Sequence, residues 1–214
     1  MQTEIASEAA RRIQTEHPDL MRDAVIGTCS FRPMEEAGRA IDAHKASERI
    51  HVDAGAYGAT NGDRILRFLI NANPQRERVW ASKGDFGSVF ARHAERAGFT
   101  GPNGRVGRLD KNVFDRLVSG LIATLSSAVP MAKVLDTSPY DRAMKRFHDY
   151  LKDSPEFQQE VASHVEIRFA PYSAWVVFAD GVTHGCLSGQ HCFIWTALTP
   201  FRNMHFPELA PISV

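Results

Sequence analysis

The N-terminal part of the chain has the hydrophobic spacing of helices. Between residues 4 and 24, apolar side chains recur at roughly the spacing of one helix face, at Ile5, Ala9, Ile13 and Leu20. A second segment, residues 34–47, follows Pro33, and proline is common at the start of a helix. The pattern therefore predicts N-terminal helices within residues 1–48.

From residue 49 onward the pattern changes to short apolar runs that are typical of β-strands. The first group comprises residues 49–53 (RIHVD), 65–70 (ILRFLI) and 78–81 (RVWA); the second comprises VEIRF, AWVVFAD and QHCFIWTAL, from residue 165 onward. Between them, residues 86–159 have mostly helical spacing, with helices predicted at 86–97, 112–126 and 139–152. Two β segments, 49–84 and 165–200, therefore flank a mostly helical insert. They must pair with each other, because neither would form a stable core alone.

Composition and charge describe an ordinary globular protein. The chain has 214 residues, of which 43% are hydrophobic, so a single domain (residues 1–214) can bury its core without disulfides. Its 25 Lys and Arg residues balance its 25 Asp and Glu residues, which gives no sign of a nucleic-acid polymer or a membrane as partner. Three cysteines cannot form a disulfide framework, and the polar N-terminus is unlike a signal peptide. We therefore expect a cytoplasmic protein with a small-molecule substrate, and a homodimer stays open.

His51 and Asp53 are the first residues that suggest chemistry. Residues i and i+2 of a strand point to the same face, so the imidazole and the carboxylate can project together. His184 follows the run AWVVFAD in a Gly-containing turn, from which a side chain can point into a cavity. Two histidines and one carboxylate on one face suit Fe(II) and leave coordination positions open for a co-substrate and O2. The three residues are therefore candidate metal ligands and candidate catalytic residues.

Structural interpretations of the same residues stay open. His51 and Asp53 could form a local surface hydrogen bond, and His184 could cap a turn. A structural zinc site could also combine the two histidines and two cysteines of the pattern H-x-C-x4-H-C, which are His184, Cys186, His191 and Cys192. It is disfavoured, because the paired C-x-x-C spacing of such sites is missing.

Arg67 lies among the apolar residues of the run 65–70, where a cation needs an anionic partner to offset its desolvation. A dicarboxylate co-substrate would supply one, because a guanidinium binds a carboxylate through two parallel hydrogen bonds. Alternation along a strand places Asn71 on the same face as Arg67. Alternatively, Arg67 is a solvated residue of an edge strand.

Three long segments resemble the Kdo hydroxylases, which are Fe(II)- and 2-oxoglutarate-dependent dioxygenases acting on an eight-carbon sugar of bacterial lipopolysaccharide. The segments are RIHVDAGAYGATNGDRILRFLINANPQRERVWA, SPYDRAMKRFHDYLKD and FAPYSAWVVFADGVTHGCLSGQHCFIWTAL, and the resemblance extends over residues 49–200. It implies a mainly β fold with flanking helices: a double-stranded β-helix (a cupin-like jelly roll) with N-terminal helices and a helical insert. It also implies that His51, Asp53 and His184 bind the iron, and that Fe(II), 2-oxoglutarate and O2 take part in the reaction.

The resemblance also bears on where 2-oxoglutarate would bind. Many relatives hold its carboxylate with an arginine shortly after the second histidine, but residues 193–196 (FIWT) include no cation. This departure makes Arg67 the predicted anchor, with Asn71 and Thr196 as further co-substrate contacts. The candidate substrate contacts are Tyr57, Arg64 and Trp80, for which a surface or core position is the structural alternative.

The activity that the resemblance implies is hydroxylation of an unactivated C–H bond, with succinate and CO2 as co-products. The expected substrate is a small polar molecule such as a sugar acid, a nucleotide or a biosynthetic intermediate. Related halogenases have a small residue in place of the carboxylate, so Asp53 favours hydroxylation over chlorination. The alternative from another class is a non-catalytic, cupin-like protein that binds a metal or another ligand.

Overall fold

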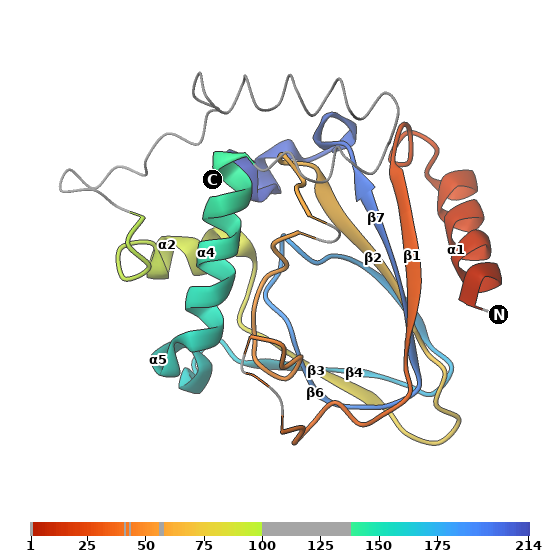
Figure 1. The fold of residues 1–214 in the computed structure, drawn as a ribbon, viewed down its shortest axis with the longest axis horizontal. Helices are drawn as coiled ribbons and strands as arrows, with labels where there is room; N and C mark the ends of the chain where they lie inside the picture. The colour runs from red at the N-terminus through yellow and green to blue at the C-terminus, as the bar shows by residue number, and fades with distance from the viewer. Residues whose placement is uncertain (1, 41, 43, 56–57, 100–137) are drawn as a thin grey trace.

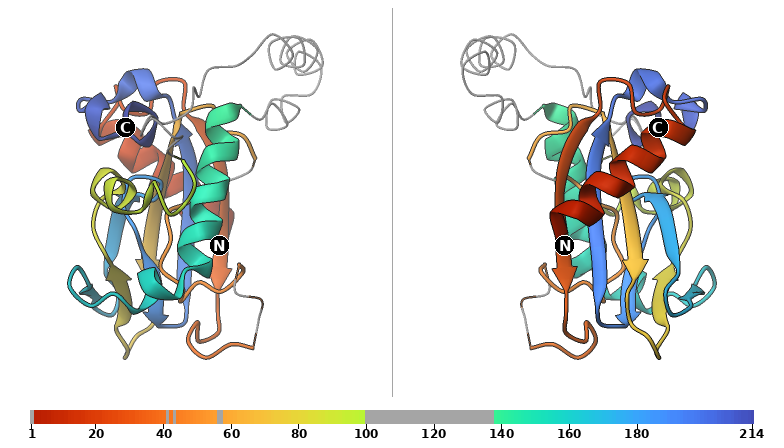
Figure 2. Two further views of the ribbon diagram at one scale, coloured as in Figure 1. Left: turned by 90° about the vertical axis from the view of Figure 1, so that its left-hand side faces the viewer. Right: turned by 90° about the vertical axis from the view of Figure 1, so that its right-hand side faces the viewer.

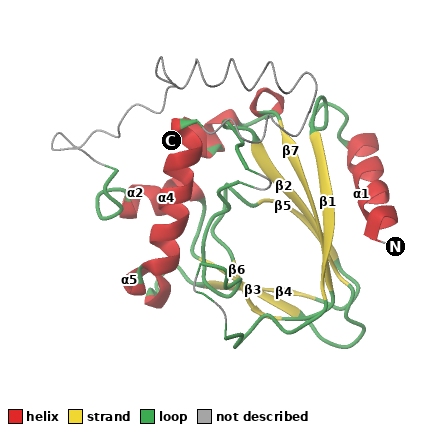
Figure 3. Cartoon of the chain, viewed as in Figure 1, coloured by secondary structure: helices red, strands yellow, loops and turns green. Residues whose placement is uncertain are grey.

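The computed structural model describes residues 2–40, 42, 44–55, 58–99 and 138–214 (Figure 1). Its described strands form two antiparallel sheets. The first sheet has the strand order β1 (Val25–Arg32), β7 (Cys192–Thr199), β2 (Arg64–Asn71) and β5 (Ala174–Phe178). The second has the order β4 (Val165–Phe169), β3 (Arg78–Ser82) and β6 (Gly185–Ser188). In Figure 3 the second sheet lies across the lower ends of the strands of the first.

The described helices are α1 (Gln2–Glu16), α2 (Phe86–His93), α4 (Pro139–Asp153) and α5 (Pro155–Gln159). Three short 3-10 helices follow β7, at Phe201–Asn203, Pro207–Leu209 and Pro211–Ser213. No helix in the described part of the chain is both long enough and apolar enough to cross a membrane.

Strand β7 is the centre of the first sheet, and all eight of its residues are buried. It pairs with β1 on one side and with β2 on the other, which confirms that the two β segments pair across the insert. The outer face of this sheet packs against α1 through Trp195 and Leu66, which meet Ala9 and Ile13; Figure 2 shows α1 lying along the strands. Tertiary packing of an amphipathic face thus holds this helix in place.

Helices α2, α4 and α5 form one layer against the second sheet and the segment that carries His51. Their apolar faces share a buried cluster with Ala81 of β3 and with Ile50 and Val52. Helix α4 begins where the sequence predicts, at Pro139, with Ser138 as N-cap in a capping box with Asp141. The helices predicted at 86–97 and 139–152 are therefore confirmed, and the one at 112–126 lies outside the described residues.

The prediction of helices throughout residues 1–48 is partly wrong. Helix α1 ends at Glu16 and not at residue 24, because Pro18 disfavours the helical conformation at His17. Strand β1 follows at 25–32, where the sequence analysis predicted no strand. The alternating exposure of its side chains shows a strand half covered by its neighbours.

Residues 34–47 are also not helical where the structure describes them. Gly38 has a φ of 68°, a left-handed conformation that interrupts a helix. Two acidic side chains before it fix the segment to the rest of the protein. Glu35 accepts a hydrogen bond from the Gly189 N–H, and Glu36 accepts one from the Arg78 guanidinium. The segment is thus an irregular strap along the rim of the second sheet.

Candidate metal centre and active-site pocket

Residues 49–53, called here the ligand segment, carry the first two candidate ligands, and the segment is joined directly to the third. The His51 N–H donates to the His184 carbonyl at 3.0 Å, and the His184 N–H donates to the His51 carbonyl at 2.7 Å. The Asp53 N–H donates to the Ala179 carbonyl at 2.9 Å. The predicted strand at 49–53 is therefore reduced to an isolated bridge, and this bridge brings the two histidines together.

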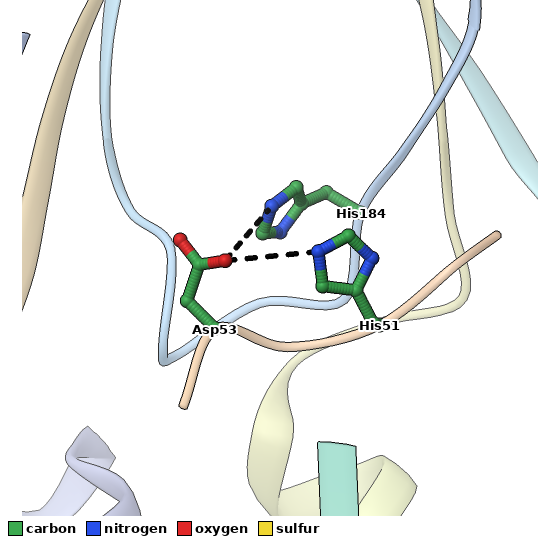
Figure 4. A group of neighbouring side chains, drawn as sticks. All are labelled: His51, Asp53 and His184. Carbon is green, nitrogen blue, oxygen red and sulfur yellow. Dashed lines mark ion pairs between the residues drawn. The ribbon is translucent and has the colours of Figure 1, made fainter. Parts of the chain in front are cut away.

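The three candidate ligands converge, as Figure 4 shows. The Asp53 Oδ1 atom lies 3.6 Å from His51 Nε2 and 3.9 Å from His184 Nε2. The two imidazole centroids are 4.8 Å apart. One ligand atom from each residue can be chosen so that all three lie within 4.8 Å of one another. The sequence prediction that these distant residues meet on one face is confirmed.

Hydrogen bonds set the orientation of both imidazole rings. The Nδ1 atom of His51 lies 2.7 Å from the Arg49 carbonyl, and that of His184 lies 3.1 Å from the Val182 carbonyl. A carbonyl can only accept, so each Nδ1 carries the proton and each Nε2 keeps its lone pair. Both Nε2 atoms face Asp53, which is the arrangement that a metal ion requires of neutral imidazole ligands.

The geometry and the donor set fit a divalent transition metal. Two ligands about 2.1 Å from one ion lie about 3 Å apart at a right angle and about 4.2 Å apart on opposite sides. The two distances from Asp53 Oδ1 to the histidine Nε2 atoms fall in this interval, and all three ligand atoms lie within 4.8 Å of one another. Two histidines and one carboxylate form the facial set that suits Fe(II) and leaves other positions of the ion open.

Burial and neighbouring charges keep the ligand set ready for a cation. Burial lowers the pKa of His51 to about 3, although the neighbouring Asp53 carboxylate acts in the opposite direction. Burial also lowers the pKa of His184. For Asp53, burial favours protonation, but the Arg67 cation and the two imidazoles outweigh it, so the pKa of the carboxyl lies below its usual value. The site therefore presents two neutral imidazoles and one carboxylate at neutral pH.

We expect Co(II) to bind nearly as tightly at pH 6.0 as at pH 7.5. Two histidines with the ordinary pKa of about 6.5 would both have to lose protons, which would weaken binding about tenfold at the lower pH. Here the pKa values of His51 and His184 are already lowered, so no proton has to leave in this range. Titration with Co(II) at the two pH values measures the difference. A tenfold loss at pH 6.0 would show that the rings are protonated before the metal binds.

The triad lies in a pocket of about 170 Å³ between the two sheets. Its floor includes Leu69, Ile194 and Trp80, and the Trp80 ring is stacked on His184 with centroids 5.1 Å apart. Five cationic side chains also line it: Arg32, Lys45, Arg67, Arg78 and Lys152. Such a lining favours an anionic ligand beside the metal site.

Arg67 lies beside the triad, as its predicted position requires. Its Nε atom is 2.7 Å from the Asp53 Oδ2 atom, the carboxylate oxygen that is not the one closest to the histidines. The guanidinium is thus already paired with a candidate metal ligand, and its side chain is 23% exposed. Thr196 is opposite Arg67 in the β2–β7 register and is buried.

Arg78 is a functional candidate that the sequence analysis missed. Its side chain is 2% exposed, and Glu36 Oε1 lies 3.4 Å from its Nη2 atom. Its Nε and Nη1 atoms are buried without a hydrogen-bond partner among the described residues. An unsatisfied buried guanidinium in a pocket indicates a site for an anion. The sequence feature that could have revealed Arg78 is its position at the start of the apolar run 78–81 (RVWA), which resembles the position of Arg67 among apolar residues.

Asn71 and Arg64 are not brought to this pocket. The Asn71 amide donates to the carbonyls of Arg76, Phe169 and Ala170, so it holds a turn together. Arg64 is paired with Asp180 at 2.6 Å and is absent from the residues that line the pocket. It borders another cavity, of about 680 Å³, which contains none of the three candidate ligands. Tyr57, the remaining predicted substrate contact, lies outside the described residues.

Comparison with known proteins identifies the family. The family model for 3-deoxy-D-manno-oct-2-ulosonic acid (Kdo) hydroxylase matches residues 1–214. A search of curated protein sequences gave no match. Similar solved structures include the Kdo hydroxylase KdoO, a non-heme Fe(II) alphaketoglutarate dependent dioxygenase, in complex with alphaketoglutarate and Fe(III). Others are its complexes with cobalt(II) and with succinate and Fe(III).

The similarity extends over nearly the whole of this chain. For the alphaketoglutarate complex the TM-score is 0.78 at 27% identity, and for the succinate complex it is 0.75 at 26% identity. The cobalt(II) complex also has a TM-score of 0.78 at 27% identity. Each alignment covers 99% of this chain but only 65–66% of the KdoO chain. Because the family model matches every residue from 1 to 214, the chain belongs to the Kdo hydroxylase family.

Proposed function

We propose that this protein is an Fe(II)- and 2-oxoglutarate-dependent dioxygenase that hydroxylates a C–H bond of a small sugar acid related to Kdo. The observation that carries the proposal is the convergence of two neutral imidazoles and one carboxylate in a pocket lined by cations. Family membership supports the same activity. The KdoO complexes with alphaketoglutarate (2-oxoglutarate) and succinate are those of a co-substrate and its product.

The arrangement of the two sheets supports the assignment of the fold as a double-stranded β-helix. The strand orders β1-β7-β2-β5 and β4-β3-β6 place the sequence neighbours β4, β5, β6 and β7 alternately in the second and the first sheet. The ligand segment extends the second sheet next to β6 through its bridge to His184. Chain crossing between two facing antiparallel sheets is the pattern of a jelly roll, and the proposed metal site lies between the sheets.

The protein residues of the proposed centre have separate tasks. His51 and His184 would hold the metal through Nε2, and Asp53 through Oδ1. Arg67 would restrain the other carboxylate oxygen, so that Asp53 offers one oxygen to the ion. When bound, the iron with O2 and 2-oxoglutarate supplies the oxidising chemistry. The apolar side chains Leu69, Trp80 and Ile194 exclude water from this part of the pocket.

Two arginines are candidates for the carboxylate of 2-oxoglutarate that lies away from the metal. Arg67 forms an ion pair with Asp53 at 2.7 Å, although its Nε atom makes no hydrogen bond among the described residues, whereas Arg78 has two such unsatisfied atoms, Nε and Nη1, and no ion pair with a candidate ligand. We therefore assign Arg78 as the principal anchor, because its free donors can bind a carboxylate through two hydrogen bonds. Arg67, with Thr196 opposite it in the sheet, remains a proposed contact near the metal.

The proposed substrate class follows from the charges at the edge of the pocket. Arg32 and Lys45 line the pocket and are both exposed, which suits an anionic group that arrives from solvent. A sugar acid has a carboxylate for these cations and hydroxyl groups for the polar rim. Trp80, stacked on His184, is the proposed apolar contact for the sugar ring.

The proposed activity is tested by incubating the protein with Fe(II), 2-oxoglutarate, O2 and Kdo-containing sugars. We expect succinate to form, and to form faster with a substrate than without one, together with a product heavier by one oxygen. Mass spectrometry measures both products. Binding of Co(II) and 2-oxoglutarate without succinate formation would instead indicate the non-catalytic binding protein. No affinity for 2-oxoglutarate would contradict the proposal.

A further inference from the structure

The backbone of the ligand segment pairs with another extended segment along only one of its two edges. In extended chain, the N–H and C=O groups of alternate residues point to opposite edges. His51 and Asp53 use their backbone groups toward His184 and Ala179, as described above. The backbone groups of Ile50 and Val52 therefore point to the other edge. Among the described strands none pairs there.

Helices α4 and α5 supply side chains to this second edge. Gln158 of α5 contacts both backbone groups of Ile50: Oε1 accepts from its N–H at 3.1 Å, and Nε2 donates to its carbonyl at 2.8 Å. A neighbouring strand would make the same pair of bonds. The Nδ1 atom of His148 in α4 lies 2.6 Å from the Val52 carbonyl. A carbonyl accepts only, so the ring donates to it.

His148 also contacts a candidate ligand through its ring. Its imidazole packs edge-on against that of His51, with centroids 4.9 Å apart. Gln158 is itself fixed, because Nε2 donates a second hydrogen bond to the Leu151 carbonyl of α4 at 2.8 Å. Both side chains therefore link the helical layer to Ile50 and Val52, the residues on either side of His51.

We propose that Gln158 and His148 are positioning residues for the metal ligands: they act as a substitute strand that fixes the backbone of the ligand segment. The inference rests on the proposed function, since it concerns the same metal site. Neither residue binds the ion. Hydrogen-bond partners of the ligating side chains themselves typically contribute 10–100-fold to metal affinity, because ligands that are already oriented lose little freedom on binding. We expect residues that fix the backbone of the ligand segment to act in the same way, toward the lower end of this range.

The test is Co(II) affinity and the visible absorption spectrum of the Co(II) protein, measured on four variants of the full chain. Gln158→Met keeps the side-chain length but removes all its hydrogen bonds, and His148→Phe keeps a ring against His51 but removes the donor. We expect each to weaken Co(II) binding about tenfold or more and to change the spectrum. His148→Asn places an amide N–H near the position of Nδ1 and should restore most of the affinity. Gln159→Met, at an exposed neighbouring position of α5, should behave as wild type.

Loss of stability alone is separated by a further control. Phe90→Leu removes apolar contacts from the same buried cluster, at a side chain that makes no hydrogen bond to the ligand segment. It should lower the midpoint temperature of thermal unfolding and leave the Co(II) affinity unchanged. If Gln158→Met does not fold, Gln158→Glu keeps the shape of the side chain and the acceptor for the Ile50 N–H, but replaces the donor to the Ile50 and Leu151 carbonyls with a carboxylate oxygen that repels both. Wild-type affinity and spectrum in the Gln158 and His148 variants would overturn the inference while leaving the proposed function intact. Failure of the wild-type protein to bind Co(II) would overturn both.

Discussion

Replacing Asp53 with alanine should abolish metal-dependent succinate formation and weaken Co(II) binding by about 100-fold or more. The change removes one of the three candidate metal ligands, and the only one of the three that is anionic. It also leaves the Arg67 cation without its partner at 2.7 Å, so the site then repels a divalent ion. Calorimetric titration with Co(II) and a succinate assay measure the two effects.

Controls separate this effect from a loss of fold. The double variant Asp53→Ala/Arg67→Met removes the unpaired cation and should recover stability but not metal binding. Asp180→Ala breaks another buried ion pair, with Arg64, which lies outside the pocket. It should lower the free energy of unfolding by roughly 3–5 kcal/mol and leave the Co(II) affinity of the folded protein unchanged. Tight Co(II) binding by Asp53→Ala would show that the ligand set is assigned incorrectly.

Removing the Arg78 guanidinium should raise the Kd for 2-oxoglutarate by about 30-fold or more, equivalent to about 2 kcal/mol. The variant is Glu36→Gln/Arg78→Met, because Arg78→Met alone would leave the buried Glu36 carboxylate with only the partly exposed Arg39, at 3.7 Å, as its cation. Co(II) affinity should stay within a few-fold of wild type, since the ion pair of Arg78 is with Glu36 and not with a triad ligand. Binding of 2-oxoglutarate to the Co(II)-loaded protein is measured by calorimetry.

The matched comparison is with Arg67, the anchor predicted from the sequence. Arg67→Met should weaken Co(II) binding as well as 2-oxoglutarate binding, because Arg67 restrains Asp53. Glu36→Gln alone should have a small effect, since both unsatisfied donors of Arg78 remain. If Arg67→Met loses 2-oxoglutarate while the Arg78 variant binds it normally, the sequence-based assignment is right and the present one is wrong.

The strands that were predicted correctly are those whose local sequence by itself favours the β conformation. The runs at β2, β3, β4, β5 and β7 are apolar and rich in β-branched or aromatic residues, so their local preference agrees with the sheet. Strand β1 (VIGTCSFR) has a glycine and three small polar or thiol side chains. Its conformation is imposed by pairing with β7, which no local pattern reveals. The strap at 34–47 was missed for a similar reason, because Glu35 and Glu36 bind partners far away in the sequence.

The metal triad was predictable because a same-face spacing and a turn histidine are visible in the sequence. The anion-binding residues were harder to predict, because their assignment depends on which arginine already has a carboxylate partner within the protein. Arg64, Arg67 and Arg78 look alike in the sequence, yet only the folded chain pairs the first with Asp180 and the second with Asp53. Asn71 was misplaced because alternation gives the face of a side chain but not its hydrogen bonds.

The backbone bridge between His51 and His184 constrains when the protein can acquire its metal. During synthesis His51 emerges from the ribosome well before its partner His184, and β7 of the first sheet follows later still. Closing a loop of this length is slow compared with local helix formation. The proposed metal site can therefore form only after residues 184–199 have been synthesised, and translation products that end before His184 should remain metal-free.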